Sequence, residues 1–185
     1  MREVRTFGAV AARIYRLFHR NPQSNRILVD LAELRAGDRA LEVGCGPGAG
    51  VEAAAKKIGS DRVAAVDPSP TFVDMVRKRV PGADVRVSGA EDVPFADGSF
   101  TVIWSIASMH HWNDRDKGLA TLTAKLNVPG RLLLAERLLA GPGHGITREQ
   151  TAEVVAHLER LGYAQVRTVE RAVGRKVIMI IIASR

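Results

Sequence analysis

Apolar residues recur along the chain with two spacings, one typical of helices and one typical of strands. Apolar side chains within residues 7–18 recur at helical spacing with arginines on other faces, which predicts an amphipathic helix, and residues 24–34 predict a second. Strand and helix patterns then alternate. The predicted strands are residues 39–43, 62–67, 83–88, 100–105 and 131–136, and the predicted helices are residues 48–58, 69–80, 114–126 and 147–161. This alternation predicts a parallel sheet with helices on both faces.

The end of the chain breaks the alternation. Residues 164–171 and 176–183 have strand patterns, and the turn around Gly174 leaves no room for a crossover helix, so they are predicted to form an antiparallel hairpin. The second strand is apolar at nearly every position, which places it inside the sheet. The expected fold class is α/β: a Rossmann-like, seven-stranded, mostly parallel sheet with one antiparallel strand.

A length of 185 residues favours a single domain, 1–185, with N-terminal helices (1–38), a core (39–136) and a C-terminal helix and hairpin (137–185). The only cysteine, Cys45, excludes an internal disulfide and a multi-thiolate metal site and favours a reducing compartment. The first 20 residues lack the uninterrupted apolar core of a signal peptide, and the longest apolar run, residues 177–183, has strand length. We expect a cytoplasmic protein without a membrane span.

The formal net charge of +7 comes from the two ends of the chain. Residues 1–39 and 137–185 each hold eight Lys/Arg against four Asp/Glu, whereas residues 40–136 hold eleven against twelve. Such ends are compatible with nucleic-acid binding, with an anionic substrate, or with an arginine-rich lineage in which they have no function.

The segment LEVGCGPGAG, residues 41–50, places glycines at positions 44, 46 and 48 directly after a predicted strand. Glycines there let a ligand lie against the backbone and accept the positive φ of a tight turn. Asp67 ends the next strand, 19 positions after Gly48, where a carboxylate can accept both hydroxyls of an adenosine ribose. A dinucleotide and S-adenosylmethionine both satisfy these two features, and Glu42 with the terminal hairpin favours the second.

Five segments in order resemble the class I S-adenosylmethionine-dependent methyltransferases, specifically the small methyltransferase type 11 group similar to the ubiquinone/menaquinone-biosynthesis enzymes. They are LEVGCGPG, AVDPSPTFVDMVRKR, GAEDVPFADGSF, MHHW and PGRLLLAE. The resemblance is close over residues 39–136 and architectural elsewhere. It implies a methyltransferase of the EC 2.1.1 class that uses S-adenosylmethionine and releases S-adenosylhomocysteine, with the donor bound to the core and the N-terminal helices covering the site.

The resemblance also implies the residues that bind the donor. Glu42 and the glycine loop would surround its methionyl part, Asp67 would bind the ribose hydroxyls and Pro68 would lie against the adenine. Ala90 and Glu91 would line the adenine edge. Ser105 and Ile106, at the end of the fourth strand, would meet the amino-acid end of the donor. The full implied set is Glu42, Gly44, Cys45, Gly46, Gly48, Asp67, Pro68, Ala90, Glu91, Ser105 and Ile106.

The chain departs from the family pattern at three places. The run Ser88-Gly89-Ala90 replaces Gly-Asp-Ala, so a side-chain hydrogen bond to the adenine amino group is expected to be missing. Thr101 replaces a common aspartate, which indicates a local packing change. The turn before the fifth strand is shortened to residues 128–131. None of these touches the glycine loop or Asp67, so binding of the donor is expected to persist.

Methyl transfer from a sulfonium is an in-line displacement that needs alignment and exclusion of water, and a base only if the acceptor must lose a proton. His110 and His111, just past the fourth strand, are the candidate catalytic residues. Adjacency is expected to point them in different directions, and the alternative is that they only pack. His144 is a weaker candidate to reach the acceptor. Tyr15 is a weaker candidate to close over the donor. Cys45 lies at a helix N-terminus, which can lower the pKa of a thiol, but it is expected to be a small residue that lines the donor pocket.

The sequence shows no histidine and carboxylate set with metal-ligand spacing, so no metal is expected. The fourth strand lacks the Asn/Asp-Pro-Pro-aromatic continuation of amino-group methylases, and no cap is inserted. These absences favour a small organic acceptor, and an anionic acceptor is compatible with the arginines. The acceptor pocket is expected to be walled by the first helix, the segment SIASMHHW and residues 137–146. The alternatives are an RNA methyltransferase or basic nucleic-acid-binding protein, an NAD(P)-binding domain with a parallel sixth strand, and a non-catalytic partner subunit.

Overall fold

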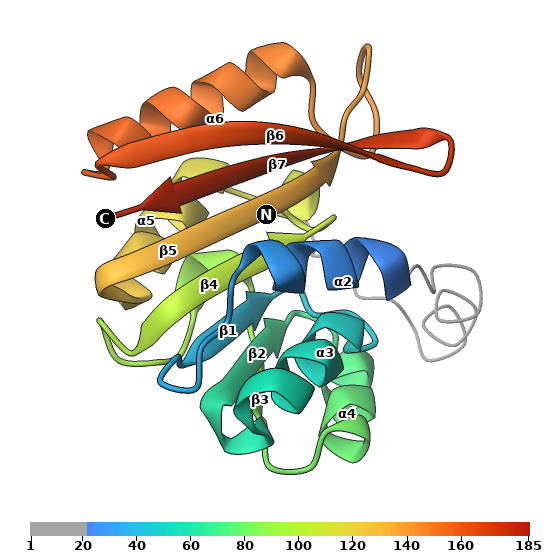
Figure 1. Ribbon diagram of the computed structural model, residues 1–185, viewed down its shortest axis with the longest axis vertical. Helices are drawn as coiled ribbons and strands as arrows, with labels where there is room; N and C mark the ends of the chain where they lie inside the picture. Colours follow the sequence, from blue (N-terminus) through green and yellow to red (C-terminus); the bar gives the residue numbers. More distant parts are fainter. Residues whose placement is uncertain (1–21) are drawn as a thin grey trace.

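The computed structural model describes residues 22–185, so the helix predicted over residues 7–18, with Tyr15, lies outside the described residues. The described chain builds one seven-stranded sheet in the order β3-β2-β1-β4-β5-β7-β6 (Figure 1). The strands are β1 (Ala40–Val43), β2 (Val63–Asp67), β3 (Asp84–Val87), β4 (Phe100–Ile106), β5 (Leu126–Arg137), β6 (Gln165–Val173) and β7 (Lys176–Ser184). Strands β1 to β5 pair in parallel, and β7 is antiparallel to both its neighbours. The predicted fold class is confirmed.

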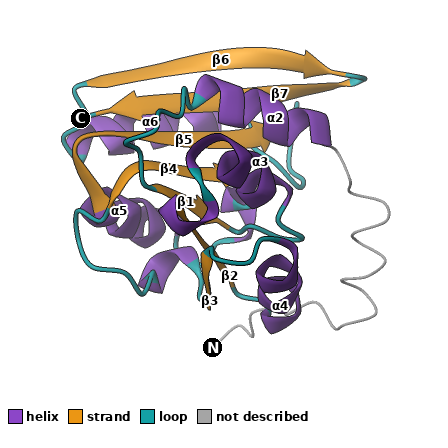
Figure 2. Ribbon diagram, turned by 60° about the horizontal axis from the view of Figure 1, so that its bottom comes forward, coloured by secondary structure: helices purple, strands orange, loops and turns teal. Residues whose placement is uncertain are grey.

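Helices cover both faces of the sheet, as the alternating pattern predicts (Figure 2). They are α2 (Pro22–Leu31), α3 (Ala49–Ile58), α4 (Pro70–Arg79), α5 (Arg115–Lys125) and α6 (Arg148–Arg160), with the short 3-10 helices η1 (Ser60–Arg62), η2 (Ala90–Asp92) and η3 (Met109–His111). Leu28, Val51 and Val73 bring α2, α3 and α4 into one core, and Leu119 and Leu158 bring α5 and α6 into the other. The sheet therefore separates two apolar layers.

The C-terminal hairpin has the predicted position. Residues 179–183 of β7 are buried, and β7 lies between β5 and β6, whereas most residues of the edge strand β6 are exposed. An apolar strand with both faces covered gains burial on each face, which explains why β7 and not β6 is internal. The parallel sixth strand required by the NAD(P)-binding alternative does not occur among residues 22–185.

Strand β5 begins earlier than the sequence predicts, because Leu126 follows α5 directly and pairs with Phe100 at the start of β4. The backbone of Gly130 is held at the other side of the strand, where Gly130 and Arg185 exchange two N–H···O=C hydrogen bonds of 3.1 Å. The shortened turn at residues 128–131 thus becomes part of a long strand. The apolar pattern misses this segment because its side chains are largely exposed.

The amino ends of the central strands are joined by a polar network that explains Thr101. Its hydroxyl donates to Asp38 Oδ1 at 2.7 Å, and Arg131 NH2 lies 2.6 Å from Asp38 Oδ2. Arg131 also donates to backbone carbonyls after α2. Burial raises the pKa of Asp38, but the hydrogen bonds from Arg131, the Arg35 backbone and Thr101, with the Arg131 charge, outweigh it and lower the pKa. Thr101 therefore belongs to this hydrogen-bonded network.

Replacing Arg131 with methionine is expected to lower the free energy of unfolding by roughly 2–4 kcal/mol, because it leaves the buried Asp38 carboxylate without its cation. The contribution of Asp38 is present above its ordinary pKa of 3.8 and is lost as pH falls through the lowered folded-state pKa, so the loss in the variant should shrink in acid. Denaturant unfolding at neutral and acidic pH measures the loss of unfolding free energy and its dependence on pH. Lys117→Met, which removes an exposed pair with Asp92, is the control and should stay within about 0.5 kcal/mol of the wild type; equal losses would contradict the assignment.

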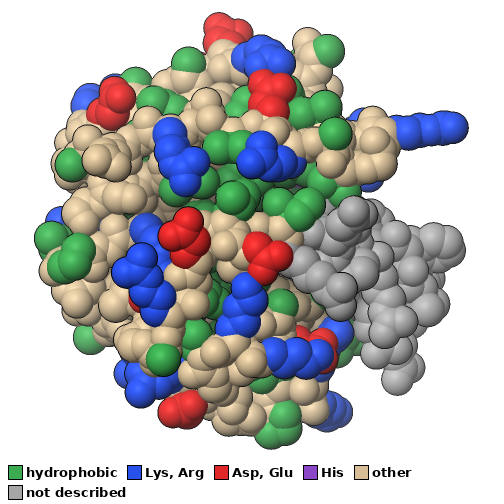
Figure 3. All heavy atoms as spheres, viewed as in Figure 1, with side chains coloured by type: hydrophobic (Ala, Val, Ile, Leu, Met, Phe, Trp, Pro, Cys, Tyr) green, Lys and Arg blue, Asp and Glu red, His purple; other side chains and the backbone are tan. Residues whose placement is uncertain are grey.

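Charged side chains are mixed over the surface. On the face drawn in Figure 3, Lys and Arg are interspersed with Asp and Glu among the described residues. Many cations are paired, for example Arg79 with Glu52 at 2.5 Å. The net charge therefore does not gather into one basic area on this face. None of the helices in the described part of the chain is long and apolar enough to cross a membrane.

Candidate active site

The glycine loop, residues 44–48, leaves the end of β1 and leads into α3. Its three glycines have left-handed φ angles of 73°, 50° and 82°, which side chains rarely adopt. A Cβ on Gly44 would lie 1.9 Å from Ser108 Oγ, and one on Gly48 would lie 2.7 Å from Val76 Cγ2. A Cβ on Gly46 would meet no described atom within 4 Å. Two glycines thus permit packing within the protein, and Gly46 presents bare backbone to open space, where a ligand can lie.

Asp67, at the end of β2, fixes the glycine loop. Its Oδ2 accepts a hydrogen bond from Gly46 N at 2.8 Å, and its Oδ1 accepts one from Ser69 N at 2.9 Å. Burial raises the pKa of this carboxyl group, and the two N–H donors act in the opposite direction. A carboxylate has about four acceptor positions, so about two remain for hydroxyl groups of a ligand. The predicted role of Asp67 at a ribose is compatible with this geometry and stays a prediction.

Glu42 lies beneath the first turn of α3, against Gly50. A Cβ on Gly50 would lie 2.4 Å from Glu42 Oε1, and Glu42 Oε2 has no hydrogen-bond partner within residues 22–185. The pKa of Glu42 is raised to about 8, mainly by burial and to a smaller extent by the negative charge of Asp67, while Trp104 and the Val51 backbone oppose the shift. A buried acceptor with spare capacity fits a cationic ligand close by.

The Glu42→Gln variant is expected to remove a pH-dependent loss of stability. Because the folded-state pKa of Glu42 is above its ordinary value of 4.5, the wild-type protein loses stability as pH rises from that value through about 8. Between pH 5 and pH 9 the variant should gain roughly 3–5 kcal/mol relative to the wild type. Denaturant unfolding at several pH values without ligand measures this difference. Parallel pH profiles for the two proteins would contradict the buried, neutral state of Glu42.

Ala90 and Glu91 begin η2, beside α5. Ala90 is buried in the core, and Glu91 Oε1 accepts hydrogen bonds from the backbone N–H groups of Asn113 at 2.8 Å and Asp114 at 3.1 Å. Glu91 thus fixes the segment that precedes α5. Its contact with adenine stays a prediction, as does that of the exposed Pro68.

Cys45 is buried in the core under the glycine loop. Burial raises the pKa of its thiol well above the ordinary value, and the charges of Asp67 and Glu42 act in the same direction. The sequence-based suggestion that a helix N-terminus lowers this pKa is therefore wrong, because desolvation is the larger effect. A neutral, buried thiol agrees with the expected role as a wall residue.

The end of β4 joins the glycine loop to the predicted catalytic segment. Ser105, level with Val43 of β1, is buried, and its Oγ has no partner among the described residues. Ile106 is half-buried, and Ala107 follows with a left-handed φ of 49°, a strained conformation for alanine. Ser108 then packs against Gly44. The chain is thus turned so that η3 begins directly beside the glycine loop.

His110 forms a pair with Glu136 that the sequence did not reveal. Glu136, the penultimate residue of β5, is 3% exposed, and its Oε2 lies 2.7 Å from His110 Nδ1. Its Oε1 also accepts a hydrogen bond from His110 N at 3.3 Å. Because an ionised carboxylate only accepts hydrogen bonds, Nδ1 carries the hydrogen, and in the neutral ring Nε2 carries the lone pair. A glutamate buried at the end of an apolar strand was the available sequence signal for this residue.

The rings of His110, His111 and His144 form one cluster. Their centroids are 4.0 Å apart for His110 and His111, 5.7 Å for His110 and His144, and 5.6 Å for His111 and His144. The expectation that adjacency points His110 and His111 apart is wrong, because the tight turn of η3 sets their rings side by side. Burial lowers the pKa of His111, with the charges of His110 and His144 acting likewise and that of Glu136 opposing.

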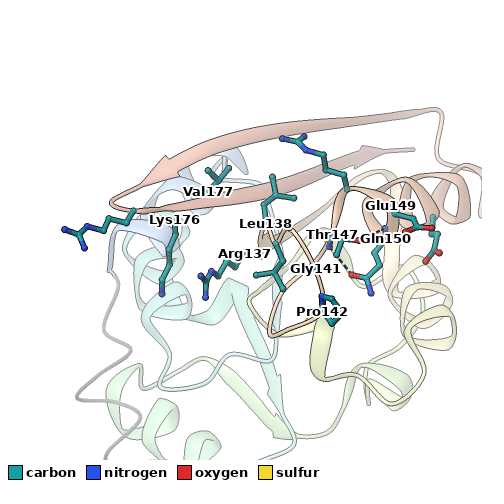
Figure 4. Close-up of a pocket in the computed structure, with 14 residues that line it drawn as sticks. Arg137, Leu138, Gly141, Pro142, Thr147, Glu149, Gln150, Lys176 and Val177 are labelled. Atoms are coloured by element: carbon teal, nitrogen blue, oxygen red, sulfur yellow. Dashed lines mark hydrogen bonds between the residues drawn. The ribbon is translucent and has the colours of Figure 1, made fainter.

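A groove of about 940 Å³ adjoins the loop that carries His144 (Figure 4). It lies between the last residue of β5 with the segment that follows it (residues 137–142), the start of α6 and the start of β7. Arg137, Arg148, Arg175 and Lys176 line it together with two glutamates. Arg148 is paired with Glu170, whereas Arg137, Arg175 and Lys176 have no ion pair within the described chain. The groove therefore has unneutralised positive charge.

Residues 41–134 match the methyltransferase-domain family known as Methyltransf_11, and the chain belongs to this family. It is 35% identical over 120 residues to methyltransferase GfsG of Streptomyces halstedii, a match covering 62% of this chain and 43% of that protein. It is 32% identical over 127 residues to the 27-O-demethylrifamycin SV methyltransferase of Amycolatopsis mediterranei, covering 64% and 46%. The matched region thus spans less than half the length of either relative.

The structure of the 1,6-didemethyltoxoflavin-N1-methyltransferase of Burkholderia thailandensis, with 1,6-didemethyltoxoflavin and S-adenosylhomocysteine bound, has the same fold. The TM-score is 0.75 at 16% identity, covering 95% of this chain and 84% of that one. The family and S-adenosylmethionine as cofactor, both predicted from the sequence, are confirmed. The bare backbone at Gly46 and the unpartnered Ser105 Oγ and Glu42 Oε2 fit such a ligand at the ends of β1 and β4.

Proposed function

We propose that this protein transfers a methyl group from S-adenosylmethionine to a small organic acceptor by in-line displacement. When bound, the donor supplies a methyl group already activated on its sulfonium. The observation that carries the proposal is the packing of Ser108 against Gly44, which joins the segment that bears His110 and His111 to the glycine loop; of the three glycines in that loop, Gly46 is the one that faces open space. Donor-side and acceptor-side groups thus meet at the carboxyl ends of β1, β4 and β5, where ligands of α/β sheets bind.

In this proposal His110 accepts the proton that the acceptor must lose. Glu136 holds the ring orientation and tautomer through Nδ1 and stabilises the imidazolium that forms, which leaves Nε2 facing the acceptor. Ser105 and Ile106 support the amino-acid end of the donor. An acceptor with an ionisable O–H or N–H group fits this arrangement, whereas an acceptor that needs no deprotonation would not use it.

The charge of the groove in Figure 4 supports an acceptor with a negative group. Arg137 from β5 and Lys176 from β7 line the groove beside the loop that carries His144, and neither is neutralised by a described partner. A carboxylate or phosphate there would gain charge-assisted hydrogen bonds. The mixed charges on the face in Figure 3 favour this use of the basic residues over nucleic-acid binding.

A screen of acidic and neutral metabolite fractions with isotope-labelled S-adenosylmethionine tests this function. The expected result is release of S-adenosylhomocysteine with the label in a small molecule. For an anionic acceptor, the double variant Arg137→Gln, Lys176→Gln should raise KM with little change in donor affinity. Label found only in RNA added to the reaction would contradict the small-molecule assignment.

A further inference from the structure

The histidine cluster has the composition of a metal site that linear spacing hides. One ring nitrogen from each of His110, His111 and His144 lies within 4.8 Å of the others. His110 and His111 come from η3, and His144 comes from the loop between β5 and α6, so the fold and not a sequence motif brings them together. The rings of His111 and His144 make no hydrogen bond within residues 22–185.

Glu136 supplies the second feature of a histidine metal site. Ligating histidines usually donate their other ring N–H to a carboxylate, which fixes the ring and raises its basicity. Glu136 is buried and accepts that hydrogen bond from His110 Nδ1 at 2.7 Å, which leaves Nε2 for an ion.

The loop that carries His144 allows the ligands to close on an ion. Nitrogens bound to one tetrahedral zinc ion lie roughly 3.4 Å apart, so the observed spacing requires a small movement of the exposed rings. His144 is flanked by Gly143 and Gly145, and hydrogen bonds from Ile146 N to Arg137 O and from Leu139 N to Ile146 O, both 2.9 Å, fix the base of the loop. The base is fixed while the tip that bears His144 is exposed.

We propose that His110, His111 and His144 bind one zinc ion, with Glu136 as the carboxylate partner of His110 and the fourth coordination position open to water or an acceptor oxygen. Three imidazoles and an open position are a known zinc arrangement, and imidazole suits zinc among the first-row metals. The sequence-based expectation of no metal rested on spacing alone. The inference goes beyond the proposed function and concerns the zinc-loaded protein: Nε2 of His110 cannot bind zinc and accept a proton at the same time, so His110 acts as the base only in the zinc-free protein.

The test is a zinc titration of the full chain without a histidine tag, by calorimetry and by competition with a chromogenic chelator. We expect one equivalent with a Kd below about 10 µM, weakened about 100-fold or more by His144→Ala and about 10- to 100-fold by Glu136→Gln. Cobalt in place of zinc should give the intense visible absorption of tetrahedral coordination, which His144→Ala should abolish.

Two controls keep the outcome specific. His157→Ala, on α6 and outside the cluster, should bind zinc as the wild type does. All variants are also titrated with S-adenosylhomocysteine, so a misfolded protein or a failure of the donor site is seen separately from a failure of the zinc site. No zinc binding tighter than about 100 µM, or the same affinity after His144→Ala, overturns the proposal.

Discussion

The Asp67→Ala variant is expected to bind S-adenosylhomocysteine about 30- to 1000-fold more weakly than the wild type, or roughly 2–4 kcal/mol. The loss has two sources in the structure. Ribose hydroxyls would lose an anionic acceptor, and the glycine loop would lose the hydrogen bond from Gly46 N that shapes the donor site. Isothermal titration calorimetry with the purified variants measures the effect.

Two further variants separate these sources. Asp67→Asn keeps one oxygen for a backbone N–H but removes the charge, so its loss should be intermediate. Asp74→Ala removes an exposed carboxylate on α4 and is expected to leave the affinity unchanged. Unchanged affinity in Asp67→Ala, with the fold intact by circular dichroism, would contradict the placement of the ribose.

The His110→Ala variant is expected to lower the rate of methyl transfer about 10²- to 10⁴-fold while leaving donor affinity unchanged. The reason is that the buried Glu136 carboxylate binds Nδ1 of His110 and thereby holds Nε2 in position to accept a proton. Within residues 22–185, neither of the other two histidines of the cluster forms a hydrogen bond with a carboxylate. Single-turnover transfer to an acceptor found by the screen measures the rate, and calorimetry measures the donor affinity.

Glu136→Gln and His157→Ala complete this test. Glu136→Gln retains a hydrogen-bond acceptor for Nδ1 but does not stabilise the imidazolium, so an intermediate loss of rate is expected. His157→Ala removes a histidine on α6 outside the cluster and should retain the full rate. If His110→Ala and His111→Ala both transfer at the wild-type rate, the general-base assignment is wrong.

Much of the fold follows from local features of the sequence. The strands β1 and β2 are short apolar runs that end at the glycine loop and at Asp67, and the internal position of β7 follows from its apolar residues on both faces. The start of β5 was not predictable from the pattern, because residues 127–129 are exposed and only the flanking residues Leu126 and Gly130 pair with distant segments, at Phe100 and Arg185.

The site was predictable in its donor half and less so in its acceptor half. The partner of His110 is 26 positions away, and only the register of β4 against β5, which sets Ile106 beside Ala135, brings Glu136 to it. His144 joins the cluster through a loop whose path depends on three-dimensional closure. The direction of Glu42 was accessible in principle, because its neighbours Leu41 and Val43 face the other core and strand residues alternate.

The most direct measurement is a calorimetric titration of the purified protein with S-adenosylmethionine, S-adenosylhomocysteine and a nicotinamide dinucleotide. We predict saturable one-to-one binding of the first two and none of the third, because in the donor site that we propose the adenosine and its amino-acid tail would lie along the bare backbone at Gly46 with the sugar at Asp67. Binding of the dinucleotide with no heat from either sulfur compound would contradict the donor site described for this protein.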